Sequence, residues 1–173
     1  MVSDLGVLVD SQLSMADHVA ALSRASVSAT RLVWSSLTEE SAKTLVHAFV
    51  SSRLDYCNSL LYGVSNELLQ KLQVIQNVAA RVVMGARKFD HITPLLRKLH
   101  WLPVRQRIRF TLAMTIYKCL YGLVPQYLAD DCVLVSSVAS RQHLRSADTQ
   151  KLVVWRTRTV LAARDLAVSC VVV

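Results

Sequence analysis

Hydrophobic residues recur every three or four positions along most of this chain, which is the period of an α-helix with one buried face. Four long segments share this period, at about 14–34, 38–55, 65–85 and 103–121. The first three open with a Ser or Thr suited to capping a helix, and Gly85 stands where a glycine commonly ends one. The pattern therefore predicts four main helices.

The apolar stripes on two of these segments predict core residues. The stripe of the third segment contains Leu68, Leu69, Leu72, Ile75, Val78, Ala79 and Val82. The stripe of the fourth contains Val104, Ile108, Leu112, Ile116 and Leu120. On that segment Arg105 and Arg109 lie one turn apart on another face. We expect each stripe to pack against neighbouring helices.

Shorter elements complete the predicted architecture. Thr93-Pro94 reads as an N-cap and first helical residue, opening a short helix through Leu99. A short strand or extended lead-in is predicted over Leu5–Asp10, whereas the periodicity weakens after Cys132. We therefore predict a mainly α fold, a small bundle of about five helices with a short N-terminal strand and an irregular C-terminal tail. The expected division is a helical domain over 1–132 and a weakly structured tail, possibly a short strand or helix, over 133–173.

Composition indicates a chain able to build a core but with few charges to cover its surface. Of its 173 residues, 53% are hydrophobic and 18% charged, respectively above and below the usual range. Part of the apolar surface is therefore expected to meet a partner. No apolar run reaches the roughly 18 residues of a membrane span, and the N-terminus does not have the pattern of a signal peptide. We expect no membrane partner.

The four cysteines favour free thiols in a reducing compartment. They are Cys57, Cys119, Cys132 and Cys170, and no two of them are spaced as zinc ligands usually are. We expect Cys57 and Cys119 to be buried as small hydrophobic residues.

Positive charge is concentrated in one part of the chain. Residues 81–118 hold nine Lys or Arg and one acid, Asp90, whereas bases and acids cancel elsewhere. The nine are Arg81, Arg87, Lys88, Arg97, Lys98, Arg105, Arg107, Arg109 and Lys118. A polyanion such as nucleic acid is the natural partner of such a stretch, because each neutralised phosphate releases counterions. The alternative is a basic surface with no specific partner.

Three separated segments carry a resemblance to a known family. They read SRLDYCNSLLYG at 52–63, LQ and QNVAAR within 72–81, and HITP followed by LHWLPVR within 91–105. In order and spacing they resemble the region just downstream of the palm in non-LTR, LINE-type (jockey-like) retrotransposon reverse transcriptases. The opening Leu5-Gly6-Val7, with Asp10, Leu13 and His18, resembles the end of the palm and the start of the thumb. The resemblance covers about residues 4–155.

This resemblance implies a role without catalysis. In such elements the polymerase copies RNA into DNA, its catalytic aspartates belong to the palm, and the palm is expected to precede Met1. The thumb and the following region would grip template–primer duplex and element RNA. The expected partners are thus RNA, RNA–DNA duplex and the missing palm. No cofactor is expected here, because Mg²⁺ would belong to the palm. The family also implies a cytoplasmic and nuclear location.

The chain departs from the family pattern near its end. Ala163-Arg164-Asp165 stands where the family usually has a Gly-Asp-Arg-like stretch, and the Trp-Asn-containing stretch that usually follows is not reached before Val173. This departure suggests a truncated or decayed copy.

Several residues offer alternative chemistry. Tyr127-Leu128-Ala129-Asp130-Asp131 resembles the metal-binding turn of reverse transcriptases, but that site needs a tight β-hairpin and a third carboxylate. We favour a solvated loop or helix end there. Trp101 and His100 could stack on a base, although Trp101 beside Leu102-Pro103 is more often a core residue. We interpret His91 as a turn residue.

Two functional hypotheses follow. The first is a non-catalytic fragment of an RNA-directed DNA polymerase that binds nucleic acid through the nine basic residues. The second is an inactive helical remnant, or a protein-interaction module whose apolar face once docked on the palm. An enzyme would require metal at Asp130 and Asp131 and is disfavoured, because the pair follows Pro125 and a predicted helix and no hairpin is readable there. The sequence also has no recognisable nucleophile–base set or glycine-rich phosphate loop.

Overall fold

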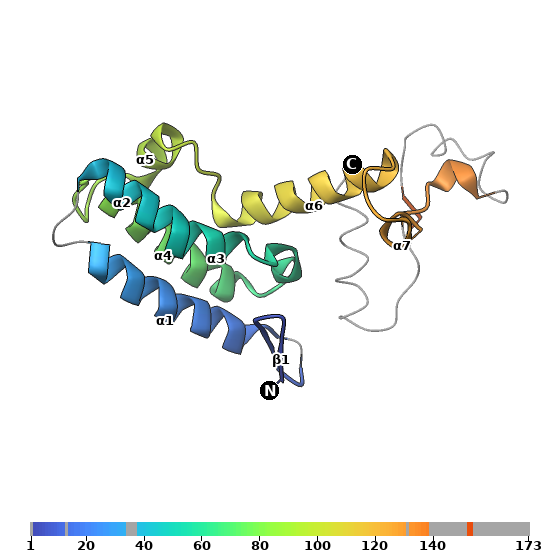
Figure 1. The fold of residues 1–173 in the computed structure, drawn as a ribbon, viewed down its shortest axis with the longest axis horizontal. Helices are drawn as coiled ribbons and strands as arrows, with labels where there is room; N and C mark the ends of the chain where they lie inside the picture. The colour runs from blue at the N-terminus through green and yellow to red at the C-terminus, as the bar shows by residue number, and fades with distance from the viewer. Residues whose placement is uncertain (1, 13, 34–37, 131, 139–151, 154–173) are drawn as a thin grey trace. The chain divides into compact units, whose positions relative to one another are not determined.

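A computed structural model describes residues 2–12, 14–33, 38–130, 132–138 and 152–153 of the chain. The described part is mainly helical, with one two-stranded hairpin at the N-terminal end (Figure 1). The predicted fold class is therefore confirmed. The chain divides into two compact units, Met1–Arg107 and Ile108–Val173, which are described separately below.

The N-terminal element is a hairpin rather than the single strand that we predicted over Leu5–Asp10. Strands β1 (Val2–Asp4) and β2 (Val7–Val9) pair antiparallel, with Asp4 opposite Val7. Leu5 and Gly6 connect them with φ values of 44° and 81°. Two positive φ values suit a two-residue hairpin turn, whose twist matches that of the strands. The turn was missed because its first position is Leu instead of Asn or Asp.

Helix α1 (Ala16–Val33) follows the hairpin. The predicted N-cap residue, Ser14, lies one position too early, because the Met15 carbonyl accepts the first helical hydrogen bond, from the Val19 amide. The Ser14 hydroxyl still accepts a hydrogen bond from the Ala16 amide at 3.3 Å. Val19 is fully buried on the inner face of α1, which packs against α4, α2 and β2. The predicted end near Trp34 lies just outside the described residues.

The second predicted helix is confirmed in extent, and it contains a widened stretch. Thr38 caps α2 (Glu39–Val46) by accepting a hydrogen bond from the Ser41 amide at 3.4 Å. The chain continues through a π-helical stretch, His47–Ser51, into α3 (Ser52–Asp55). A short 3₁₀ helix at Asn58–Leu61 follows. Hydrophobic spacing does not distinguish a π-helical turn from an α-helical one, so the sequence did not indicate it.

Helix α4 (Asn66–Val83) is the centre of the first unit and packs against α1, α2 and α5. Gly85 has a φ of 58° where we predicted a terminating glycine, and the Ala86 amide donates to the Arg81 carbonyl at 3.0 Å. The buried face differs from the predicted stripe at several positions, because Val78 is 41% exposed whereas Gln76 and Val83 are only 1% and 2% exposed. Tertiary hydrogen bonds of Gln76, described below, explain its burial.

Helix α5 (Ile92–Lys98) begins earlier than the predicted Thr93-Pro94 start. His91 is its N-cap residue, so Pro94 lies inside the first turn. This correction is physically simple, since amides of the first turn have no carbonyl partner within the helix and proline loses nothing there. The helix ends with His100 at a φ of 55° and the Trp101 amide bonded to the Leu96 carbonyl at 2.8 Å.

Two glutamines of α4, the buried Gln76 and the half-buried Gln73, hold the start of α6 (Val104–Leu120). The Gln76 amide donates to the Leu102 carbonyl at 2.8 Å. The Gln73 carbonyl oxygen accepts from the Val104 amide at 2.9 Å, and the Gln73 amide donates to Gln76 at 3.0 Å. These bonds satisfy backbone groups that the first turn of α6 and the preceding loop leave without partners. The predicted range of this helix is confirmed to within about two residues.

In the second unit, the predicted stripe of α6 is buried at Ile108, Leu112 and Ile116. Cys119 is buried next to it, whereas Leu120 is half-buried. The unit also contains α7 (Gln126–Ala129), a 3₁₀ turn at Val135–Ser137 and a bridge between Leu134 and Leu152.

The predicted domain boundary after Cys132 stays a prediction, because most of 133–173 lies outside the described residues; the compact units divide within α6 instead. Cys119 is buried as predicted, but Cys57 is only half-buried, in a left-handed conformation with a φ of 51°. Cys170 lies outside the described residues.

Candidate nucleic-acid interface

The turn after α4 presents two exposed cations, Arg87 and Lys88. Asp90 closes this turn: its carboxylate accepts a hydrogen bond from the Arg87 amide at 2.6 Å, and its carbonyl accepts one from Arg81 at 3.3 Å. The carboxylate thus accepts a hydrogen bond from the backbone of the turn and makes no ion pair with a described base. Arg81 is half-buried, and its Nε has no partner among the described atoms.

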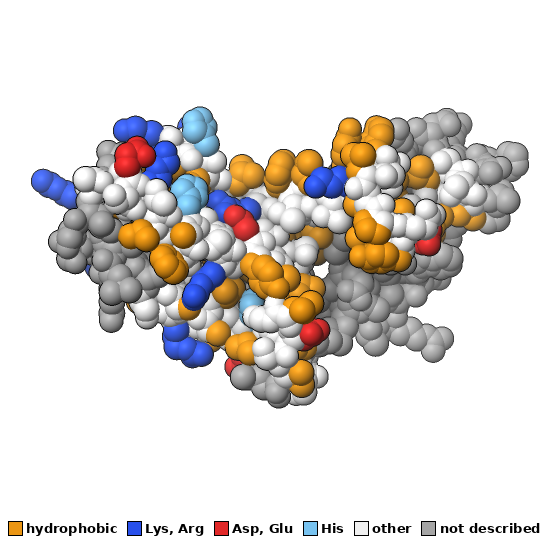
Figure 2. Space-filling view, in the orientation of Figure 1, with side chains coloured by type: hydrophobic (Ala, Val, Ile, Leu, Met, Phe, Trp, Pro, Cys, Tyr) orange, Lys and Arg blue, Asp and Glu red, His pale blue; other side chains and the backbone are white. Residues whose placement is uncertain are grey.

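Two more exposed cations, Arg97 and Lys98, occupy the last turn of α5. Because α5 packs against α4, these residues belong to the same region of the first unit as the turn that carries Arg87 and Lys88. On the face drawn in Figure 2, Lys and Arg side chains gather in the region of α5. Cations at a helix C-terminus also interact favourably with the helix dipole, which is a structural reason for their position.

Helix α6 divides its predicted cations between two roles. Arg105 and Arg109 are exposed, and Arg105 donates to the side chain of Asn66. Arg107 instead forms an ion pair with Asp55, with its Nη1 2.9 Å and 3.0 Å from the two carboxylate oxygens. Its side chain is only 15% exposed. Arg107 is therefore engaged within the fold, although the sequence pattern grouped it with its neighbours.

The nine predicted cations do not form one compact patch. Arg105 lies beside Asn66 at the start of α4, whereas Arg81 lies near the end of that helix, about 22 Å away at 1.5 Å per residue. Arg109 and Lys118 are exposed and belong to the second unit. Five cations remain grouped around the junction of α4 and α5: Arg81, Arg87, Lys88, Arg97 and Lys98.

The aromatic candidates near this junction are mostly structural. Trp101 is only 8% exposed and meets the ring of His47 edge-on, with centroids 5.5 Å apart. The core interpretation of Trp101 is therefore confirmed. His91 and His100 are exposed at the two ends of α5, where His91 is the N-cap residue.

The segment that resembles a polymerase metal turn is helical in its described part. Gln126–Ala129 forms α7, and Asp130 is an exposed residue that ends it. Asp131 lies outside the described residues. The described residues contain no group of three or more His, Cys, Asp or Glu placed to hold a metal ion.

Helix α6 carries a second apolar stripe that faces away from its buried one. Its members are Phe110, Met114, Tyr117 and Tyr121, which are 39 to 62% exposed. The rings of Tyr117 and Tyr121 lie 4.4 Å apart between centroids. Hydrophobic side chains are in view along α6 in Figure 2. The three-and-four spacing of this stripe is readable in the sequence, although only the inner face of the helix was predicted to take part in packing.

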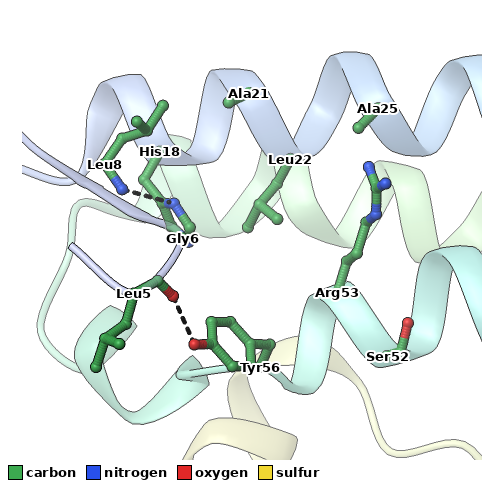
Figure 3. A pocket seen from close by; sticks show the side chains of 10 residues that line it. All are labelled: Leu5, Gly6, Leu8, His18, Ala21, Leu22, Ala25, Ser52, Arg53 and Tyr56. Carbon is green, nitrogen blue, oxygen red and sulfur yellow. Dashed lines mark hydrogen bonds between the residues drawn. The ribbon is translucent and has the colours of Figure 1, made fainter. Parts of the chain in front are cut away.

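The first unit also contains a cavity of about 660 Å³ that the sequence analysis did not anticipate (Figure 3). Its lining comes from the hairpin, from α1 and from the 52–56 segment. His18 lies buried at this site, where its Nδ1 accepts a hydrogen bond from the Leu8 amide at 3.3 Å. Burial lowers the pKa of His18 below its ordinary value. Three separate segments form this cavity, so no local motif could indicate it.

Comparison with protein-family models, with curated proteins and with solved structures finds no match to this chain. Within the described residues, no helix is long and apolar enough to cross a membrane.

Proposed function

We propose that this chain is a non-catalytic nucleic-acid-binding segment, related to the thumb and post-palm region of a LINE-type reverse transcriptase. One observation carries the proposal: Arg87, Lys88, Arg97 and Lys98 are exposed around the α4–α5 junction, and none pairs with a described carboxylate. The three motifs quoted above support the family assignment. The proposed partners are RNA and RNA–DNA duplex, and Mg²⁺ would belong to the palm of the parent polymerase.

Such contacts would hold the phosphate backbone without reading base sequence. Unpaired surface cations suit this role, because binding does not first require an internal ion pair to break. Arg105 and Arg109 are two further exposed cations, whereas Arg107 contributes mainly to the fold.

The salt dependence of binding tests this function directly. Affinity for an RNA–DNA hybrid would be measured by fluorescence anisotropy between 50 and 300 mM NaCl for the wild type and for a variant with Arg87, Lys88, Arg97 and Lys98 all changed to Gln. Each lost phosphate contact should lower the slope of log K against log salt by about 0.7 to 0.9. We therefore expect the slope to fall by about 3 units if all four contact phosphate.

A matched control removes three exposed cations elsewhere in the first unit, through Arg24→Gln, Lys43→Gln and Lys71→Gln. The junction variant should lose much more slope than this control. If both variants lose the same slope per charge, binding is only a response to net charge, and the proposed surface is wrong.

A second candidate function is protein docking, and the outer stripe of α6 favours it. Exposed Phe110, Met114, Tyr117 and Tyr121 suit a protein partner such as a polymerase palm. Changing Phe110 and Tyr117 to Gln should then abolish self-association of the isolated chain in light scattering while the salt slope stays unchanged. A monomeric wild type that binds the hybrid with a steep slope would favour the first function.

A further inference from the structure

The cavity between the hairpin, α1 and the 52–56 segment has the composition of a ligand site. At about 660 Å³ it falls within the range of about 300–1,000 Å³ that is typical of small-molecule pockets. Half of its ten lining residues are aliphatic, namely Leu5, Leu8, Ala21, Leu22 and Ala25. In Figure 3, Leu22 descends from α1 into the space that faces Tyr56 and Arg53.

Some polar groups of the lining already make hydrogen bonds within the protein, and one does not. The Tyr56 hydroxyl donates to the Leu5 carbonyl, and the Ser52 hydroxyl donates to the Ala48 carbonyl. Because His18 Nδ1 accepts from a backbone amide, the neutral imidazole carries its proton on Nε2. These bonds hold the wall of the cavity together, and they leave one fixed charge on it.

That charge belongs to Arg53. Its side chain rises from α3 toward α1, and its guanidinium lies on the Ala25 side of the cavity (Figure 3). Arg53 makes no ion pair or hydrogen bond with the described residues, and the lining contains no Asp or Glu. The nearby Asp4 acts on Tyr56 instead: it adds to the effect of Cys57, the main cause that raises the pKa of that phenol.

We propose that this cavity binds an amphipathic carboxylate, with its apolar chain or ring against Leu8, Leu22 and Ala21 and its carboxylate on Arg53. The charge complementarity selects this class: an aliphatic wall with one unpaired guanidinium favours a ligand with one anionic end, because the guanidinium can donate two parallel hydrogen bonds to a carboxylate. Arg53 is not among the nine cations of the proposed nucleic-acid surface, so this inference does not depend on the proposed function.

A fluorescent fatty acid and its methyl ester test the proposal on the full chain. Dansyl-labelled undecanoic acid would be titrated below its critical micelle concentration, and the increase in its fluorescence would give a Kd. The ester keeps the apolar body and removes the charge, so a preference for the acid measures the contribution of the guanidinium.

Three variants locate the bound probe. Arg53→Gln should weaken binding of the acid about tenfold, because it removes a charge-assisted hydrogen bond to the carboxylate, and should leave binding of the ester unchanged. Arg24→Gln removes an exposed cation of α1 that does not line the cavity, and should change neither. Ala25→Leu fills part of the cavity and should weaken both ligands. Far-ultraviolet circular dichroism checks that each variant is folded.

Three results would each overturn the proposal: no binding of the acid, equal effects of Arg53→Gln and Arg24→Gln, or unchanged binding in a folded Ala25→Leu variant. The last would place the probe on another apolar surface, such as the outer stripe of α6. A failure here would not affect the salt-slope test, because Arg53 is unchanged in both variants of that experiment.

Discussion

Arg107 illustrates how a residue with an unremarkable sequence context acquires a structural role. It lies two residues from Arg105 and two from Arg109, yet it alone of the three is paired with a carboxylate among the described residues, across 52 positions of sequence. Arg107 forms this ion pair because it lies on the turn of α6 that faces α3. No local sequence pattern predicts where Asp55 lies.

The ion pair should contribute measurably to stability. We expect Arg107→Gln to lower the free energy of unfolding by about 1 kcal/mol, a modest amount because Asp55 is 52% exposed. Urea denaturation monitored by circular dichroism measures it. Arg105→Gln is the matched control and should cost only a few tenths of that amount, since Arg105 reaches only a neutral amide. Equal losses would show that the pair contributes nothing beyond an exposed hydrogen bond.

His18 should make the hairpin sensitive to mild acid. Burial lowers its pKa in the folded chain below the ordinary value of 6.5. As the pH falls below about 6.5, the unfolded chain takes up a proton before the folded chain does, so stability decreases through the folded-state pKa. Protonation also removes the acceptor for the Leu8 amide.

The matched variant is His18→Asn, which keeps an acceptor near the position of Nδ1 and cannot titrate. We expect the urea midpoint of the wild type to fall between pH 7 and pH 5 by more than that of the variant. Amide hydrogen exchange at Leu8 should accelerate over the same range in the wild type alone, once corrected for intrinsic rates. Parallel pH profiles of the two proteins would contradict this assignment.

At the scale of elements, the glutamine pair of α4 determines how α6 begins. Gln76 is almost fully buried, and it bonds both Gln73 and the Leu102 carbonyl. A polar residue on an apolar face appears to break the helical pattern when the sequence is read alone. The structure explains it, because the loop before α6 brings backbone groups that need partners in the core.

Replacing this amide by an apolar side chain of similar size should therefore destabilise the protein. We expect Gln76→Leu to lower the free energy of unfolding by about 1–3 kcal/mol, because it leaves the Leu102 carbonyl without its buried donor. Gln70→Leu, at an exposed position of the same helix, is the control and should change stability little. A loss of equal size in both would mean that water replaces the missing bond.

Most helix boundaries could be predicted because their signals are local. Thr38 as a capping residue and Gly85 as a terminator act within one turn of where they stand. The misplaced start of α5 and the missed hairpin turn have the same origin: Pro94 is acceptable at several first-turn positions, and Leu5 is an unusual residue at positive φ. In both cases more than one backbone conformation satisfied the local rules, and packing selected one.

At the scale of the whole molecule, the described residues present three surfaces of different chemical character. The α4–α5 junction concentrates exposed cations, α6 presents an outer apolar stripe, and half of the residues that line the cavity beside the hairpin are aliphatic. From the low content of charged residues we predicted that part of the apolar surface contacts a partner. Each of these three surfaces is tested by its own experiment, so one proposal can be contradicted while the other two stand.

The sequence by itself determined the helical class, most helix limits and the stretch that carries the net charge, because these depend on residues within a few turns of one another. Only the tertiary structure decided that Arg107 pairs with Asp55, that Gln76 is buried and that Arg53 faces a cavity. Each of these depends on how distant segments meet, and the spacing of apolar residues specifies which face is buried without specifying what lies opposite it.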